Sequence, residues 1–136
     1  MDIDQDAAVE MDQLLQGIDL TKTPVHFSAS CSYSLLVDLL LKTLKKYNID
    51  PAQALGSFDF DSIAYYSLHG SFYNSAEDNF NELQCLLDLV MAKLPRFRVL
   101  NINGQIFRNA GANAIQELAW SLSVASEYFA QMSERK

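Results

Sequence analysis

The sequence predicts an α/β protein in which about three parallel strands alternate with four main helices. Four long segments carry apolar residues at helical spacing, and three shorter segments between them alternate apolar with polar residues or run as short apolar stretches. A helix long enough to cross over separates each pair of successive strands, and such crossovers join parallel strands. At 136 residues, the chain is predicted to form one domain, 1–136.

The elements of the amino-terminal half follow from the spacing of their apolar residues. Apolar positions three and four apart predict a first helix from Asp6 to Ile18, with Gly17 as a stop. Strict alternation from Val25 to Ser30 predicts a short strand. Leucines at helical spacing predict a second helix over Ser32–Tyr47, and Leu55–Phe60 reads as the next strand.

The carboxyl-terminal half continues the same order. Asp61–His69 is predicted to be a short helix, and Ser75 to begin a long one that ends before Pro95. Arg98–Ile102 is the third predicted strand. The last helix is predicted from Asn113 to Gln131, with a buried face made by Ile115, Leu118, Ala119, Leu122, Ala125 and Phe129.

Charge and composition exclude several classes of partner. The formal net charge of -7 repels nucleic acid and anionic lipid surfaces. No apolar stretch reaches the length of a membrane span, and the acidic start Met1–Asp6 lacks the features of an export signal, so we expect a cytoplasmic protein. Cys31 and Cys85 are expected to be buried, reduced thiols.

Two stretches carry a resemblance to a known family. In Arg98–Tyr128, a strand leads through a turn with glycine and the sequence Arg-x-Ala-Gly-Ala, starting at Arg108, into a helix that opens with Gln116-Glu117. This stretch resembles methylmalonyl-CoA mutases and related acyl-CoA mutases. Gly56–Gly70 is similar to an earlier strand and turn of the same barrel, and Met11–Ile18 to the helix before it. The resemblance implies an interior slice of a (β/α)8 barrel.

The resemblance also implies that this chain is inactive by itself. Where the family's catalytic chains have a histidine that touches the substrate thioester, this sequence has Ile106, which neither donates a hydrogen bond nor moves a proton. Where they have an arginine that pairs with the substrate carboxylate, it has His69.

These departures match the family's small, non-catalytic subunit. The implied role is structural, beside a catalytic large subunit, in an enzyme that interconverts methylmalonyl-CoA and succinyl-CoA. The complete enzyme would use adenosylcobalamin, with no cofactor bound by this chain. We predict no catalytic, cofactor-binding or metal-binding residue here.

Pocket residues are expected at the carboxyl ends of the strands, where barrels of this kind bind ligands. The candidates are Ser30, Asp59, Asp61, Asn103, Gln105 and Arg108. An acid/base or metal site built on Asp59 and Asp61 is the weakest hypothesis, because a lone Asp-x-Asp lacks further ligands and Asp61 suits a helix N-cap.

Two further possibilities remain open on the sequence. One is a stand-alone module that binds an acyl-CoA or a nucleotide without catalysis. The other concerns assembly: a slice of a barrel leaves sheet edges and helix faces uncovered, which predicts self-association.

Overall fold

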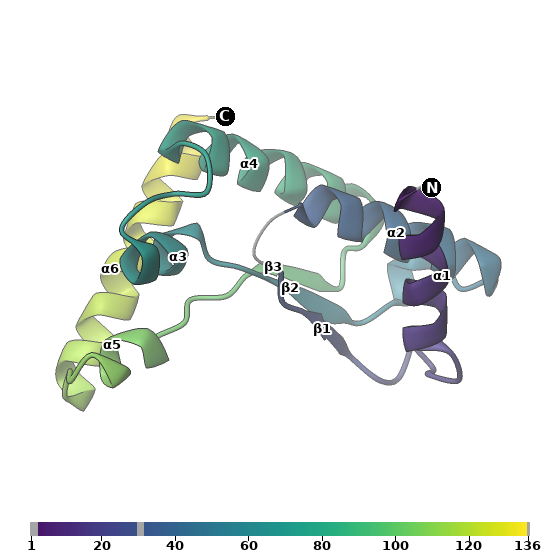
Figure 1. Cartoon of the computed structure of the whole chain (residues 1–136), viewed down its shortest axis with the longest axis horizontal. Coiled ribbons are helices and arrows are strands. Elements are labelled where there is room, and N and C mark those ends of the chain that lie inside the picture. Colours follow the sequence, from purple (N-terminus) through teal and green to yellow (C-terminus); the bar gives the residue numbers. More distant parts are fainter. Residues whose placement is uncertain (1–2, 30–31, 136) are drawn as a thin grey trace.

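The computed structural model describes residues 3–29 and 32–135, and Figure 1 shows their arrangement. The elements in chain order are α1 (Ile3–Leu15), β1 (Val25–Phe27), α2 (Tyr33–Lys46), a short 3-10 helix η1 (Pro51–Gln53), β2 (Gly56–Phe60), α3 (Ser62–His69), α4 (Ala76–Lys93), β3 (Phe97–Leu100), α5 (Gln105–Asn109) and α6 (Ala114–Glu134).

The sheet has three strands in the order β1-β2-β3, and both pairs are parallel. In the register, Phe27 lies beside Phe58, and Ser57 lies beside both His26 and Arg98. The predicted α/β class with three parallel strands is therefore confirmed. The sequence did not predict η1 or α5, which are only one turn or so long.

The two faces of the sheet differ in chemistry. Figure 1 shows α2 and α4 on the same side of the sheet, with α1 packed beside α2. The strand residues on that side are apolar and buried: Phe27, Phe58, Phe60, Phe97 and Val99. No helix among residues 3–29 and 32–135 covers the opposite face, whereas parallel sheets normally carry helices on both faces. That uncovered face is where ligands can reach the strands.

Side chains at the helix starts fix where the helices begin. The Asp61 carboxylate accepts a hydrogen bond from the backbone N–H of Ala64 at 3.0 Å, which makes it the N-cap of α3. The Ser75 hydroxyl accepts one from the N–H of Asp78 at 3.0 Å and caps α4. Asn113 caps α6 in a capping box. These bonds satisfy amide groups that the first turn of a helix leaves unpaired.

Helix α6 contradicts the prediction about its buried face. Its buried residues are Val124 and Tyr128, whereas Ile115, Leu118, Leu122 and Phe129 are exposed by 59–80%. The apolar spacing was detected correctly, but spacing does not reveal whether a neighbour covers the face. In this structure α6 packs against α5 and α4 along its other side, at the edge of the molecule (Figure 1).

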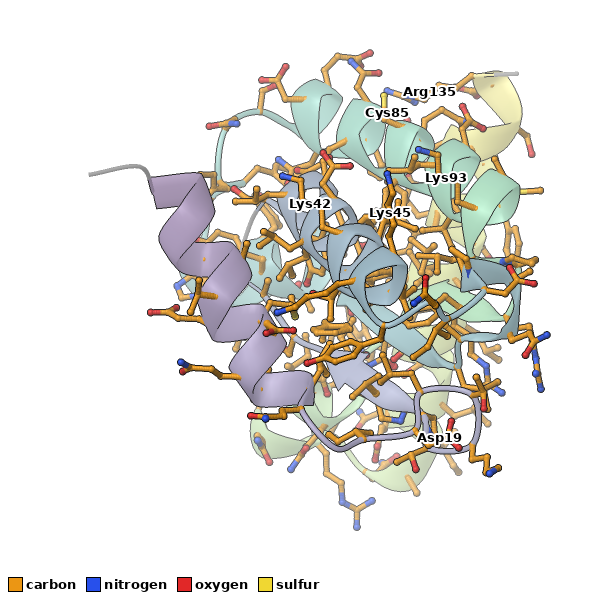
Figure 2. All side chains as sticks on the ribbon, turned by 90° about the vertical axis from the view of Figure 1, so that its right-hand side faces the viewer. Asp19, Lys42, Lys45, Cys85, Lys93 and Arg135 are labelled. Carbon is orange, nitrogen blue, oxygen red and sulfur yellow. The ribbon has the colours of Figure 1, made fainter. Side chains whose placement is uncertain are left out.

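The prediction that the cysteines are buried is also wrong where it can be examined. Cys85 is exposed, on the outer side of α4 (Figure 2), because the residues of α4 that face the core are Phe80, Leu83, Leu86 and Val90. Cys31 lies outside the described residues. Within the described ranges, no helix has the length and hydropathy needed to cross a membrane.

Candidate functional site

A hollow of about 340 Å³ lies at the carboxyl ends of the strands, and we call it the strand-end hollow. Its lining includes four acidic side chains, Asp59, Asp61, Asp78 and Glu82. Among the described residues, no lysine or arginine lines it. The strand-end hollow therefore presents negative charge to any ligand.

Asp61 holds three elements together at this hollow. Besides capping α3, its carboxylate accepts a hydrogen bond from the Tyr128 hydroxyl of α6 at 2.9 Å and one from the N–H of Asn103, after β3, also at 2.9 Å. The N–H of Ile63 donates to the same Tyr128 oxygen at 3.0 Å. Burial, with the Asp61 charge adding to it, raises the pKa of Tyr128 well above its usual value. Because its carboxylate already accepts hydrogen bonds from Ala64, Asn103 and Tyr128, Asp61 has a structural role.

Asp59 is held differently from Asp61. Its carboxylate accepts a hydrogen bond from the Ser57 hydroxyl at 3.1 Å, while its backbone carbonyl accepts one from the Tyr33 hydroxyl at 2.7 Å. Burial raises the pKa of the Tyr33 phenol, so this donor stays protonated at neutral pH. The structure thus brings Asp59, Asp61 and Asn103 to one hollow.

The remaining candidates lie elsewhere. Gln105 begins α5 and is exposed. Arg108 is exposed as well and forms an ion pair with Glu117 of α6, with the Nη1 and Oε2 atoms 3.1 Å apart. Neither side chain lines the strand-end hollow. Ser30 is outside the described residues.

A second hollow, of about 580 Å³, lies on the sheet face that no described helix covers, and we call it the sheet-face hollow. His26, Ser57 and Asp59 line it together with Arg96 and Arg98. The Nδ1 atom of His26 is 2.7 Å from the Ser57 hydroxyl oxygen, whose own proton goes to Asp59. His26, Ser57 and Asp59 are therefore linked by successive hydrogen bonds across β1 and β2.

The direction of these hydrogen bonds decides what His26, Ser57 and Asp59 can do chemically. A serine becomes a nucleophile when a histidine accepts its proton. Here the Ser57 proton goes to Asp59, so Nδ1 of His26 must donate, and Ser57 is not activated. The described residues also contain no group of three or more His, Cys, Asp or Glu arranged to hold a metal ion. The arrangement suits hydrogen bonding to a ligand rather than bond cleavage.

The sequence alone does not predict several of these residues. His26, Ser57, Arg98 and Tyr128 are not among the pocket residues that the sequence predicts. Three of them could be found from the strand pattern. His26, Ser57 and Arg98 each alternate with apolar neighbours along their strands, so in a parallel sheet they share a face. Tyr128 carries no such signal, since its bond to Asp61 joins residues far apart along the chain.

Comparison with known proteins adds the family. The family model described as methylmalonyl-CoA mutase matches residues 3–136. The chain belongs to the methylmalonyl-CoA mutase family.

Relatives within the mutase family include both kinds of subunit. The chain is 29% identical over 126 residues to the methylmalonyl-CoA mutase small subunit of Porphyromonas gingivalis, which covers 89% of this chain and 19% of that protein. It is 28% identical over 139 residues to the small subunit of Propionibacterium freudenreichii subsp. shermanii, covering 99% of this chain and 20% of that protein.

Large subunits of the mutase family match as well. The probable methylmalonyl-CoA mutase large subunit of Mycobacterium tuberculosis (strain ATCC 25618 / H37Rv) is 24% identical over 123 residues, covering 90% of this chain and 16% of that protein. The chain therefore spans about a fifth or less of the length of these relatives.

The structure places the two residues that depart from the mutase pattern. His69 is the last residue of α3; it lines the strand-end hollow and packs against Tyr65, with ring centroids 4.2 Å apart. Ile106 lies in α5, half-buried, and does not line that hollow. The side chain of Ile106 cannot donate a hydrogen bond, and the imidazole of His69 lacks the two-pronged, permanently charged group of an arginine.

Proposed function

We propose that this chain is a structural and assembly part of the small, non-catalytic subunit of adenosylcobalamin-dependent methylmalonyl-CoA mutase. The catalytic large subunit would carry out the interconversion of methylmalonyl-CoA and succinyl-CoA. The observation that carries the proposal is the acidic strand-end hollow, with Asp59, Asp61, Asp78 and Glu82 but no described lysine or arginine. A substrate that bears a carboxylate is repelled by such a lining.

Neither histidine of this chain lies in the sequence motif that binds cobalamin in the family. In the family, the histidine that would hold cobalamin belongs to the motif Asp-x-His-x-x-Gly. Pro24 and Ser67 stand where this motif would need aspartate before His26 and His69. The His26 ring is also bound to Ser57. We therefore assign no cofactor role to these histidines.

The test combines activity with assembly. The purified chain is incubated with methylmalonyl-CoA and adenosylcobalamin, and succinyl-CoA is measured by chromatography. We expect no turnover by the chain alone, and saturable binding to a large subunit of the family in a pull-down titration. Isomerisation by the chain alone would disprove the non-catalytic role. Absence of any binding to the large subunit would disprove the assembly role.

A second function is favoured by one specific observation. The sheet-face hollow carries Arg96 and Arg98 beside the hydrogen-bonding groups of His26 and Ser57, which suits an acyl-CoA or a nucleotide as a ligand in a stand-alone binding module. Calorimetric titration with coenzyme A separates the two functions. Micromolar saturable binding that is lost in Arg98→Ala but kept in Arg108→Ala would support the binding module, and no heat of binding would exclude it.

A further inference from the structure

Helix α6 carries one straight row of apolar side chains that the rest of the structure does not use. The row consists of Ile115, Leu118, Leu122, Ala125 and Phe129, and we call it the α6 row. The steps between its members alternate between three and four residues, which is the seven-residue repeat of helices that pair side by side. Its four large members are 80%, 60%, 59% and 73% exposed in chain order.

The side chains around the α6 row limit what can cover it. The row itself is uncharged, and the residues along one side of it are small: Ala119, Ser126 and Ala130. Small residues allow a second helix to approach closely. A membrane surface is disfavoured, because helices that lie on membranes carry lysine and arginine, whereas the charges within α6 are Glu117, Glu127 and Glu134.

We propose that two copies of this chain pair through their α6 rows, with the helices antiparallel and the two-fold axis close to Leu122 and Ala125. Leu118 lies four residues before Leu122 and Phe129 lies four residues after Ala125, so the row matches its own reverse and Leu118 of each copy meets Phe129 of the other. In the pair, Leu122 of each copy meets Ala125 of the other, large against small. Antiparallel helices also set the positive end of each helix dipole beside the negative end of the other.

The charged side chains beside the α6 rows do not oppose this pairing. Glu117 is turned towards Arg108 and bonds it, and Arg135, at the end of α6, bonds Glu77 of α4. No like charges therefore meet between the two rows. The length of α6, 21 residues, is about 31 Å. One helix pair covers less than the roughly 800 Å² per partner of a standard stable interface, so we expect a reversible dimer with a dissociation constant in the micromolar range.

The first measurement is sedimentation equilibrium of the whole chain over a range of concentrations. Leu122→Asp places a charge at the centre of the pair and is expected to weaken it at least about tenfold. Met91→Asp is the matched control, because Met91 is also apolar and 73% exposed but lies on α4. Both positions face solvent, so both variants should keep the circular dichroism spectrum of the parent. A chain that stays monomeric up to about millimolar concentration would overturn the proposal, and so would equal loss in both variants.

The second measurement tests the geometry by disulfide formation, in a background of Cys31→Ser and Cys85→Ser. Leu122→Cys lies next to the axis and should form a disulfide-linked dimer by itself. Ile115→Cys alone should not, because the two copies of residue 115 lie at opposite ends of the pair. Leu118→Cys mixed with Phe129→Cys should form the mixed dimer. Linkage of Ile115→Cys to itself, or no linkage of Leu122→Cys, would overturn the antiparallel pair.

This pairing does not depend on the proposed function. A large subunit is absent from both measurements, so their failure leaves the assembly role untouched. Conversely, loss of binding to the large subunit would not change the expected disulfide pattern.

Discussion

The Tyr128 hydroxyl connects α6 to the ends of the strands. It donates to the Asp61 carboxylate and accepts from the N–H of Ile63, while its ring is 2% exposed and packs edge-on against Phe80. Because α6 turns Ile115, Leu118, Leu122 and Phe129 to solvent, much of its attachment to the core depends on Tyr128, on Val124 and on the partly buried Met132.

Removing this hydroxyl should destabilise the chain and also change its response to alkali. Tyr128→Phe leaves the Ile63 N–H without its acceptor and removes one of the three donors to Asp61, so we expect the free energy of unfolding to fall by about 1–3 kcal/mol. The pKa of Tyr128 is raised in the folded state. Its stabilisation is therefore complete below the ordinary tyrosine pKa of 10.0 and decreases as pH rises above it.

The measurement is urea unfolding at a series of pH values from 7 upwards. The parent chain should lose stability more steeply above about pH 10 than Tyr128→Phe does. Tyr66→Phe is the matched control, because Tyr66 is 47% exposed and should change neither quantity. Equal alkaline slopes in the parent chain and Tyr128→Phe would contradict the assignment.

At the scale of elements, strand β2 depends on a glycine at its first position. A Cβ on Gly56 would overlap the carbonyl oxygen of Val25 and come within 2.7 Å of the Phe97 ring, so β1 and β3 both approach the bare backbone there. This is a packing requirement, since Gly56 does not have a positive φ.

Gly56→Ala should therefore damage the sheet. We expect the free energy of unfolding to fall by roughly 2–4 kcal/mol, because the strands on both sides have to move apart. Gly17→Ala is the comparison: its φ of 79° is strained for alanine, but nothing lies within 4 Å, so a loss of only about 1–2 kcal/mol is expected. Thermal melting of both variants measures the difference, and a larger loss in Gly17→Ala would refute the packing explanation.

How far the sequence predicts an element depends on whether its signal is local. The helices α2 and α4 and the strands β2 and β3 were predicted to within about two residues, because their periodicity and their caps, such as Ser75, lie within each segment. Strand β1 begins at Val25 as predicted but ends at Phe27, three residues before the predicted end. The face of α6 was predicted wrongly because burial depends on neighbours from elsewhere. In the strand-end hollow, Asp61 was predicted correctly as an N-cap, but its bonds to Tyr128 and Asn103 could not be foreseen from local sequence.

At the scale of the whole molecule, an acidic hollow and several lysines lie towards opposite ends of the sheet. The carboxyl ends of the strands carry the acidic hollow, while Lys45 and Lys93 lie near the carboxyl ends of α2 and α4, where these helices return to the other end of the sheet. Figure 2 shows Lys42 and Lys45 of α2 and Lys93 of α4 on the outer side of the two helices. The formal net charge remains -7.

Salt should therefore strengthen the proposed pair of chains. Two molecules that each carry a charge of -7 repel one another, and this repulsion is screened over about 8 Å at 0.15 M ionic strength, whereas apolar contacts between the α6 rows are not weakened by salt. We expect the dissociation constant in sedimentation equilibrium to decrease several-fold when NaCl is raised from about 20 mM to about 200 mM. An increase would indicate that ion pairs, not the α6 rows, hold the copies together.

The one-sided covering of the sheet separates two sets of residues that respond to different selective pressures. Phe58 and its neighbours under α2 and α4 hold the fold together, whereas His26 and Arg98 face the open side and are exposed. Substitutions on the open side can therefore accumulate with little loss of stability. A lineage can lose or change its ligand there while the scaffold persists, and a protein engineer can vary the same positions in a library without first having to stabilise the chain.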